Sequence, residues 1–159
     1  MSRSQTVAIL AATAALGGSA CGGDEDALSR SHPGRDLKPI TAFQDRSGPW
    51  EFRAYLDRTG CVVFSTPTAA GGNCFVEVPG DNAAEAATTT SRGREAFFGL
   101  AGPNVAAVRY RTRYGPAITE TRRVPGFPLR FFLTMHDAGV VRFVINPVAV
   151  DTRGRRVGP

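Results

Sequence analysis

Histidine, lysine and tryptophan are scarce in this chain of 159 residues. It has two histidines and one tryptophan, and Lys38 is the single lysine among 19 basic residues. With so few histidines and no C-x-x-C pair, a zinc site is not expected. The sequence also lacks a calcium-binding D-x-D-x-D-G loop, a G-x-S-x-G turn for a nucleophilic serine, and a glycine-rich phosphate loop before a helix. We therefore expect no metal and no cofactor.

Long hydrophobic runs are also missing. The run Thr6–Leu16 is uncharged and mostly apolar, but its eleven residues fall short of the roughly 20 that a membrane-spanning helix needs. It follows Arg3 and precedes the small residues 17–20, a layout typical of a secretory signal peptide rather than of a buried N-terminal helix. We therefore expect residues 1–20 to be removed on export. The remaining 139 residues carry 18 basic and 14 acidic side chains, a net charge of +4, and suffice for one domain.

The three cysteines, Cys21, Cys61 and Cys74, leave one without a partner if two of them pair. Cys61 and Cys74 flank a single loop, and export would place them in an oxidising compartment, so we predict a disulfide between them. Two buried free thiols are the alternative. Cys21 is then the odd cysteine, and a free exposed thiol in that compartment would be a liability.

The surroundings of Cys21 offer an explanation for it. The stretch LGGSACGG (16–23) resembles the lipobox of bacterial lipoproteins, in which the cysteine behind the cleavage site is acylated on its sulfur. Gly18 stands where that family usually has leucine, so ordinary signal cleavage and secretion remain an alternative. The resemblance covers about the first 23 residues and implies a lipid anchor on the outer face of the cytoplasmic membrane. It implies no activity.

After the cysteine, the chain divides into two parts. Residues 22–38 are polar, carry charges of both signs and show no periodicity, which predicts a disordered tether that includes His32. Residues 39–159 consist of short alternating segments separated by turn residues, so we predict one antiparallel β-sandwich, immunoglobulin-like, of about seven to nine strands. The expected strands lie near 40–44, 50–57, 61–65, 74–78, 94–100, 105–114, 117–124, 129–135 and 140–146, with a short final pairing of 148–151 and 155–157.

Three details refine this expectation. In WEFRAYLD (50–57) the even-numbered residues should face the core, and in 129–135 and 141–145 the odd-numbered ones. The formula Asp-x-x-Gly recurs at 45–48, 57–60 and 151–154 and is typical of type I turns. The Ala-rich segment DNAAEAATTT (81–90) is the one candidate helix.

Two further segments carry a resemblance. FFGLAGPNVAAVRYR (97–111) and VDTRGRRVG (150–158) resemble β-sandwich domains of exported proteins from GC-rich bacteria, in which a Gly-Pro corner joins two strands. The resemblance implies a β-sandwich head and no known activity.

The segment VRYRTRY (108–114) is the most unusual face of the predicted domain. Alternation places Arg109, Arg111 and Arg113 on one side, and Tyr110 and Tyr114 on the other. These arginines either form a solvated strand face or bind an anionic envelope polymer, lipid head groups or an acidic protein. The net charge is modest and dispersed, which argues against nucleic acid as a partner.

The leading hypothesis is a non-catalytic, lipid-anchored cell-envelope protein that acts as a binding or structural module. The alternative is an exported hydrolase in which His136, within TMHDAG, serves as the base for a serine delivered from another loop. A histidine beside a turn aspartate is more often ordinary turn chemistry.

Overall fold

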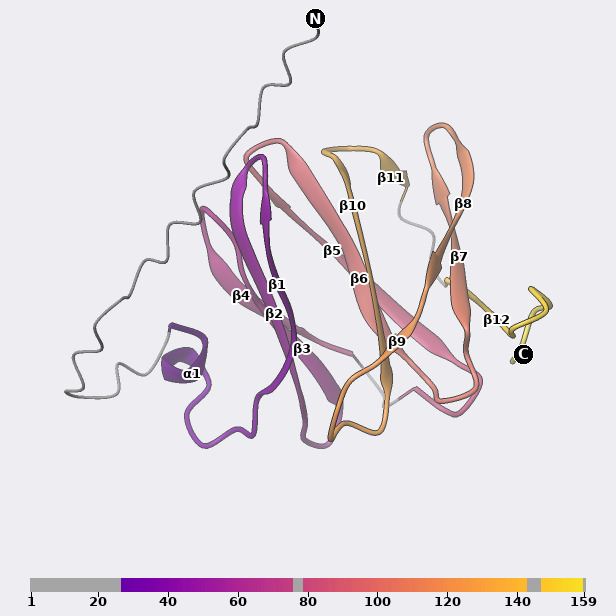
Figure 1. The fold of residues 1–159 in the computed structure, drawn as a ribbon, viewed down its shortest axis with the longest axis horizontal. Coiled ribbons are helices and arrows are strands. Elements are labelled where there is room, and N and C mark those ends of the chain that lie inside the picture. The colour runs from indigo at the N-terminus through magenta and orange to yellow at the C-terminus, as the bar shows by residue number, and fades with distance from the viewer. Residues whose placement is uncertain (1–26, 76–78, 143–146, 159) are drawn as a thin grey trace, which may run out of the picture.

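The computed structural model describes residues 27–75, 79–142 and 147–158, and its strands form three antiparallel sheets (Figure 1). The first sheet has the order β1 (Lys38–Asp45), β2 (Gly48–Leu56), β3 (Gly60–Ser65), β4 (Ala70–Cys74). The second has the order β5 (Ala84–Ser91), β6 (Arg94–Ala101), β10 (Arg130–Asp137), β9 (Arg122–Arg123). In the third, β7 (Ala107–Thr112) pairs with β8 (Gly115–Glu120) along its whole length, so β11 (Val141–Arg142) and β12 (Val148–Val150) share its other edge. The all-β antiparallel prediction is confirmed.

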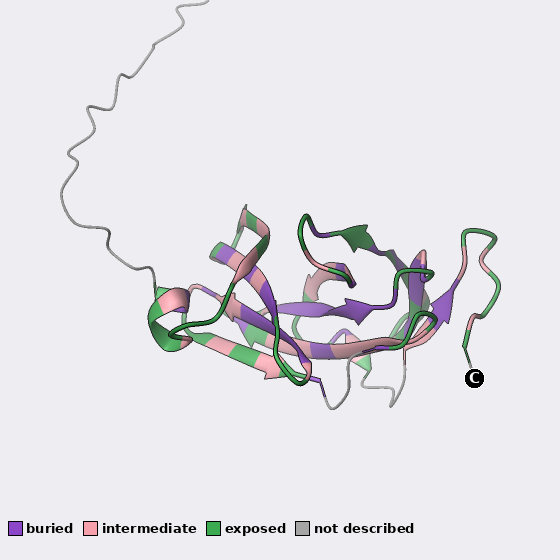
Figure 2. Cartoon of the chain, turned by 90° about the horizontal axis from the view of Figure 1, so that it is seen from below, coloured by how far each residue is buried: buried purple, intermediate pink, exposed green. Residues whose placement is uncertain are grey.

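The second sheet is the middle layer, and each of its faces packs against another sheet. One face packs on the first sheet through a core that includes Phe52 and Phe98, and the other packs on the third sheet through Phe97 and Tyr110. Residues 95–101 of β6 are buried without interruption, which is typical of a strand covered on both sides. Figure 2 shows the buried segments in the interior strands, whereas the turns and parts of the outer strands are exposed. The third sheet therefore adds a layer to the two-sheet sandwich expected from the sequence.

A short helix, α1 (Ala27–Ser31), covers the outer face of the first sheet. Leu28 is 1% exposed and packs in a small cluster with Tyr55, Cys61 and Val63. Residues 27–38 thus differ from the expected disordered tether, because this cluster gives them a packing surface. The same cluster buries Tyr55 on the outer face, where the alternation places it. Leu56, predicted to face the core, is 41% exposed, so the prediction for 50–57 is wrong at this position.

The predicted helix at 81–90 is wrong, because Ala84–Ser91 forms β5 and pairs with β6 over its full length. Three consecutive threonines in this segment favour a strand over a helix. Close packing explains why the neighbouring strand carries Gly99: a Cβ atom there would lie 1.9 Å from the carbonyl oxygen of Glu85. The fourth strand also differs, since it spans 70–74 instead of 74–78. Residues 76–78 and 143–146, parts of two predicted strands, lie outside the described residues.

Cys61 and Cys74 are directly opposite each other in the pair β3–β4, with their Cα atoms 4.0 Å apart and their Sγ atoms at the disulfide distance of 2.03 Å. The predicted pairing is therefore confirmed at the level of distance. Cys61 is 2% exposed within the cluster beneath α1. Cys74 is exposed, contrary to the expectation that it faces the core, because it lies on the exposed face of β4 together with Ala70 and Gly72.

The Asp-x-x-Gly segments form turns, but not all in the same way. Asp45 accepts a hydrogen bond from the backbone N–H of Ser47, and Asp151 accepts one from that of Arg153. The carboxylate of Asp57 forms an ion pair with Arg35 at 2.8 Å.

Candidate functional site

The outward surface of the third sheet carries three arginines, Arg109 and Arg111 on β7 and Arg142 on β11, which together we call the arginine face. Along β7 the buried residues Val108 and Tyr110 alternate with the exposed arginines, because a strand directs successive side chains to opposite faces. Arg142 pairs directly with Arg111 in the antiparallel register, so their side chains project from the same face. Arg113, the third arginine predicted for this surface, is exposed in the turn between β7 and β8.

The arginine face has no carboxylate partner among the described residues. Arg109 donates a hydrogen bond to the carbonyl oxygen of Gly154, and Arg113 donates one to the hydroxyl of Tyr114. Glu120, at the end of β8, is the only acidic residue on the four strands of this sheet. It pairs in register with Ala107 and not with an arginine. Arg111 and Arg142 therefore form no ion pair with a described residue, whereas Glu120 lies on the same face as Arg109.

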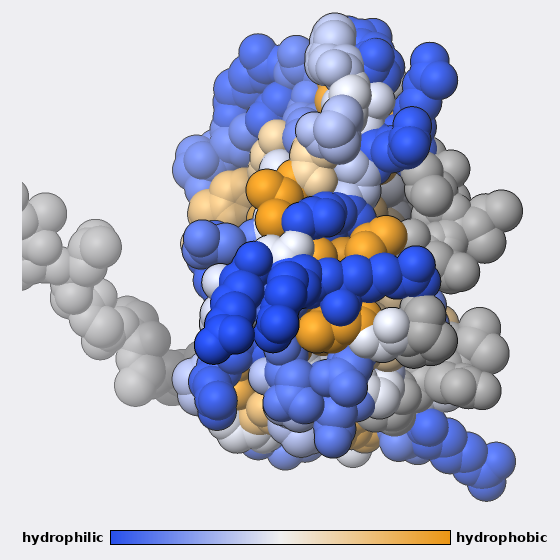
Figure 3. Space-filling view, turned by 90° about the vertical axis from the view of Figure 1, so that its right-hand side faces the viewer, coloured by the Kyte–Doolittle hydropathy of each residue, from blue (hydrophilic) through white to orange (hydrophobic). Residues whose placement is uncertain are grey.

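Apolar side chains lie beside these arginines. Ile118 is 57% exposed and pairs directly with Arg109, and Tyr114 is 75% exposed. Figure 3 shows this side of the molecule, where long hydrophilic side chains cross the surface with apolar patches between them. A surface of this kind suits a partner that combines negative charge with an apolar part.

His136, the candidate base of the hydrolase alternative, lies on β10 at the boundary between the second and third sheets. Its Nε2 is 2.8 Å from the hydroxyl oxygen of Tyr110, and it pairs in register with Glu95. Glu95 is 7% exposed and accepts a hydrogen bond from the backbone N–H of Val141. Burial lowers the pKa of His136, although the nearby Glu95 opposes this. A neutral imidazole can therefore share a hydrogen bond with the tyrosine hydroxyl at neutral pH.

No serine hydroxyl contacts His136 by a hydrogen bond within the described residues; its bonded partner is Tyr110. Burial raises the pKa of Tyr110, so the tyrosine remains protonated and is not an activated nucleophile. The arrangement supplies a polar link between two sheets. Among the described residues, His136 is thus hydrogen-bonded to a tyrosine and not to the serine that the hydrolase alternative needs.

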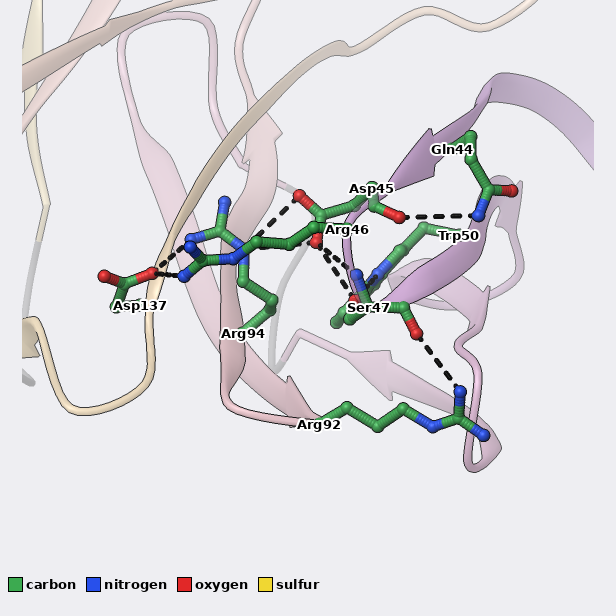
Figure 4. Close-up of polar contacts among 8 residues, drawn as sticks. All are labelled: Gln44, Asp45, Arg46, Ser47, Trp50, Arg92, Arg94 and Asp137. Atoms are coloured by element: carbon green, nitrogen blue, oxygen red, sulfur yellow. Dashed lines mark hydrogen bonds and ion pairs between the residues drawn. The ribbon is translucent and has the colours of Figure 1, made fainter.

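A charged cluster that the sequence analysis missed connects three turns at one end of the molecule (Figure 4). Arg94, at the start of β6, donates from Nε to Asp45 at 3.1 Å and from Nη1 to Asp137 at 2.6 Å. Asp137 also pairs with Arg46. These residues belong to the β1–β2 turn, the β5–β6 hairpin and the end of β10, so the cluster fixes the first sheet to the second.

Asp45 is the centre of this cluster. Burial by itself would raise the pKa of its carboxyl, but hydrogen bonds from the Ser47 backbone and from Arg94 outweigh burial and lower the pKa. Ser47 also accepts a hydrogen bond from the indole N–H of Trp50 at 2.9 Å, which connects the cluster to the core. Each acid here has a cationic or backbone partner, so the cluster is best explained as a structural element.

The described part of the chain offers neither a metal-binding cluster nor a membrane-spanning helix. It contains no group of three or more His, Cys, Asp or Glu side chains that could hold a metal ion. No helix among the same residues is long and apolar enough to cross a membrane. No protein-family model matches the sequence, and neither a curated protein nor a solved structure shows significant similarity to it.

Proposed function

We propose that this chain is a non-catalytic, lipid-anchored protein of the bacterial cell envelope whose arginine face binds an anionic surface. The observation that carries the proposal is the direct pairing of Arg111 with Arg142. Like charges directly opposite each other on neighbouring strands destabilise a sheet. Arg111 and Arg142 therefore repel each other, because no described carboxylate forms an ion pair with either of them. An anionic partner would reduce this repulsion.

The exposed apolar side chains specify the partner further. Ile118 projects beside Arg109, and an apolar side chain next to arginines is suited to the head-group region of an anionic membrane. A protein tethered to that membrane through an acylated Cys21 would hold this face at a high local concentration of its partner. An anionic envelope polymer and an acidic protein are the other candidate partners.

Co-sedimentation with vesicles tests the arginine face. The chain should bind phosphatidylglycerol vesicles, bind phosphatidylcholine vesicles far more weakly, and lose affinity as salt is raised. The variant Arg111→Gln/Arg142→Gln should bind about 30-fold more weakly, because each arginine near an anionic membrane contributes about 1 kcal/mol.

A charge-matched control is Arg30→Gln/Arg58→Gln, which removes two exposed arginines, one in α1 and one between β2 and β3, and should leave vesicle binding unchanged. Equal loss in both double variants would show that only net charge matters. Binding to soluble polyglutamate but not to vesicles would replace the membrane with an acidic polymer as the partner.

Intact-mass measurement tests the anchor separately. The chain expressed in a bacterial host should carry an acyl group and fractionate with membranes, whereas Cys21→Ser should have no acyl mass and be released. Two acyl signals are needed for stable attachment, so a mature chain with an unmodified Cys21 would refute the anchor without affecting the vesicle result.

A further inference from the structure

A groove separates the first and second sheets along one edge. It encloses about 300 Å³, at the lower end of the range of roughly 300–1,000 Å³ for small-molecule sites. The floor is formed by Phe131 and Val124, which are 2% and 5% exposed and belong to the main core. The side chains that matter for its chemistry are Ile40 and Phe43 from β1, Leu133 and Met135 from β10, and Arg122 and Arg123 from β9.

The topology explains why the groove is open. β1 is the edge strand of the first sheet, and β9 has only two residues, which pair with Arg130 and Phe131 of β10. Beyond Phe131, no described strand pairs with β10 on the β9 side. The apolar side chains of Leu133 and Met135 therefore remain half-buried at the groove.

Two arginines lie at this apolar groove and form no ion pair with the described residues. Arg122 and Arg123 are exposed, and neither forms an ion pair or a side-chain hydrogen bond with the described residues. The described lining of the groove contains no carboxylate. An arginine pair beside an apolar groove is complementary to a molecule with an aliphatic body and an anionic head.

The segment that carries these arginines is held firmly in place. The hydroxyl of Thr121 donates a hydrogen bond to the carbonyl oxygen of Val105 at 2.6 Å. Arg130 in turn donates to the hydroxyl oxygen of Thr121 at 2.6 Å and to its carbonyl oxygen at 3.0 Å. Because the backbone before β9 is fixed, less conformational entropy is lost when its side chains engage a ligand.

We propose that this groove binds an amphipathic anion, a single aliphatic chain that ends in a carboxylate or phosphate group. The chain lies against Ile40, Phe43, Leu133 and Met135, and the head pairs with Arg122 and Arg123. The site is separate from the arginine face, which lies on the outward surface of the third sheet.

Calorimetric titration of the full chain tests the proposal, with decanoate, decyl phosphate, decanol and acetate as the probes. Decanoate or decyl phosphate should bind, decanol should bind at least tenfold more weakly, and acetate should not bind measurably. The variant Arg122→Gln/Arg123→Gln should weaken the binding of the charged probe about tenfold or more, because charge-assisted hydrogen bonds are lost. The matched control, Arg30→Gln/Arg58→Gln, removes two exposed arginines outside both surfaces and should bind the probe as the wild type does.

Filling the groove tests the position of the aliphatic chain. Met135→Trp places a larger side chain in the cavity and should abolish binding of the charged probe while the far-UV circular dichroism stays unchanged. If this variant does not fold, amide shift changes in the wild type during titration should map to 40–43 and 133–135. A wild-type chain that binds neither charged probe, or shift changes centred on β7 and β11, would overturn the proposal. Equal binding of decanol and decanoate would overturn the role of the two arginines.

Which anion is the natural one follows from the same titrations. Preference for decanoate indicates a free fatty acid, and preference for decyl phosphate indicates a phospholipid or another phosphate ester. The arginine face can fail its vesicle test while the groove still binds its probe, because the two double variants remove different arginines.

Discussion

Opening the disulfide between Cys61 and Cys74 should lower the free energy of unfolding by about 3 kcal/mol. The two residues are 13 apart in the sequence, and the loss of chain entropy on closing a loop of about this length gives that figure at 25 °C. For a domain of this size, 3 kcal/mol corresponds to a fall in melting temperature on the order of 10 °C. The effect should be seen both after reduction and in the variant Cys61→Ala/Cys74→Ala.

These two perturbations differ in what they remove. Reduction keeps both sulfur atoms, so it isolates the effect of closing the loop. The double alanine variant also removes the buried Sγ of Cys61, which packs with Leu28 and Tyr55 beneath α1, and should cost somewhat more for that reason. Urea unfolding followed by the fluorescence of Trp50 measures both, since Trp50 is 1% exposed in the main core.

Cys21→Ser is the matched control for the loss of a cysteine. It should leave the urea midpoint unchanged and should keep its dependence on reductant. Alkylation of the unfolded chain without reductant should label neither Cys61 nor Cys74. Labelling of both residues, or a urea midpoint that does not move on reduction, would refute the reasoning.

Three further changes have expected outcomes. Gly99→Ala should destabilise by about 3 kcal/mol or more in urea unfolding, because its Cβ would lie 1.9 Å from the Glu85 carbonyl oxygen; an unchanged midpoint would contradict this packing. Asp45→Asn should be less stable than the wild type at pH 7, and the difference should shrink as the pH falls below about 4. A carboxyl whose pKa is lowered in the folded state stabilises above its unfolded pKa and loses that effect on protonation, so a difference that is constant with pH would exclude this role. Leu28→Ala should cost about 2 kcal/mol and make the chain near residue 31 sensitive to protease, whereas a chain with α1 undocked in solution would show neither change.

Local sequence patterns predicted most of the strands. Alternation located β2 and β10, and turn residues located the ends of β2 and β3, because side-chain period and turn chemistry are local properties. The Cys61–Cys74 pairing also followed from local spacing. Ala-rich β5 was misassigned because its strand conformation depends on pairing with β6, and tertiary context commonly overrides the intrinsic propensity of short segments.

The third layer and most of the site depend on long-range contacts. The continuous burial of β6 was present in the sequence as the run AFFGLA, but a short apolar run cannot distinguish one covered face from two. Arg94 meets Asp45 and Asp137 across sequence separations of 49 and 43 residues, and no local pattern predicts such contacts. Arg142 likewise lies on the arginine face because of the register between β11 and β7, which the sequence does not reveal. Alternation alone was enough to place Arg109 and Arg111 on this face.

The two proposed binding surfaces depend on a single corner of the chain. β8 ends at Glu120 in the third sheet, and β9 begins at Arg122 in the second, so Thr121 alone carries the chain from one layer to the next. Thr121 is 6% exposed. Its hydroxyl donates a hydrogen bond to the carbonyl oxygen of Val105 and accepts one from the side chain of Arg130. The strand edge beside the arginine face and the arginines of the groove are therefore placed by the same hydrogen bonds. Variants that leave Thr121 intact separate the two surfaces, whereas loss of its hydroxyl would disturb both together.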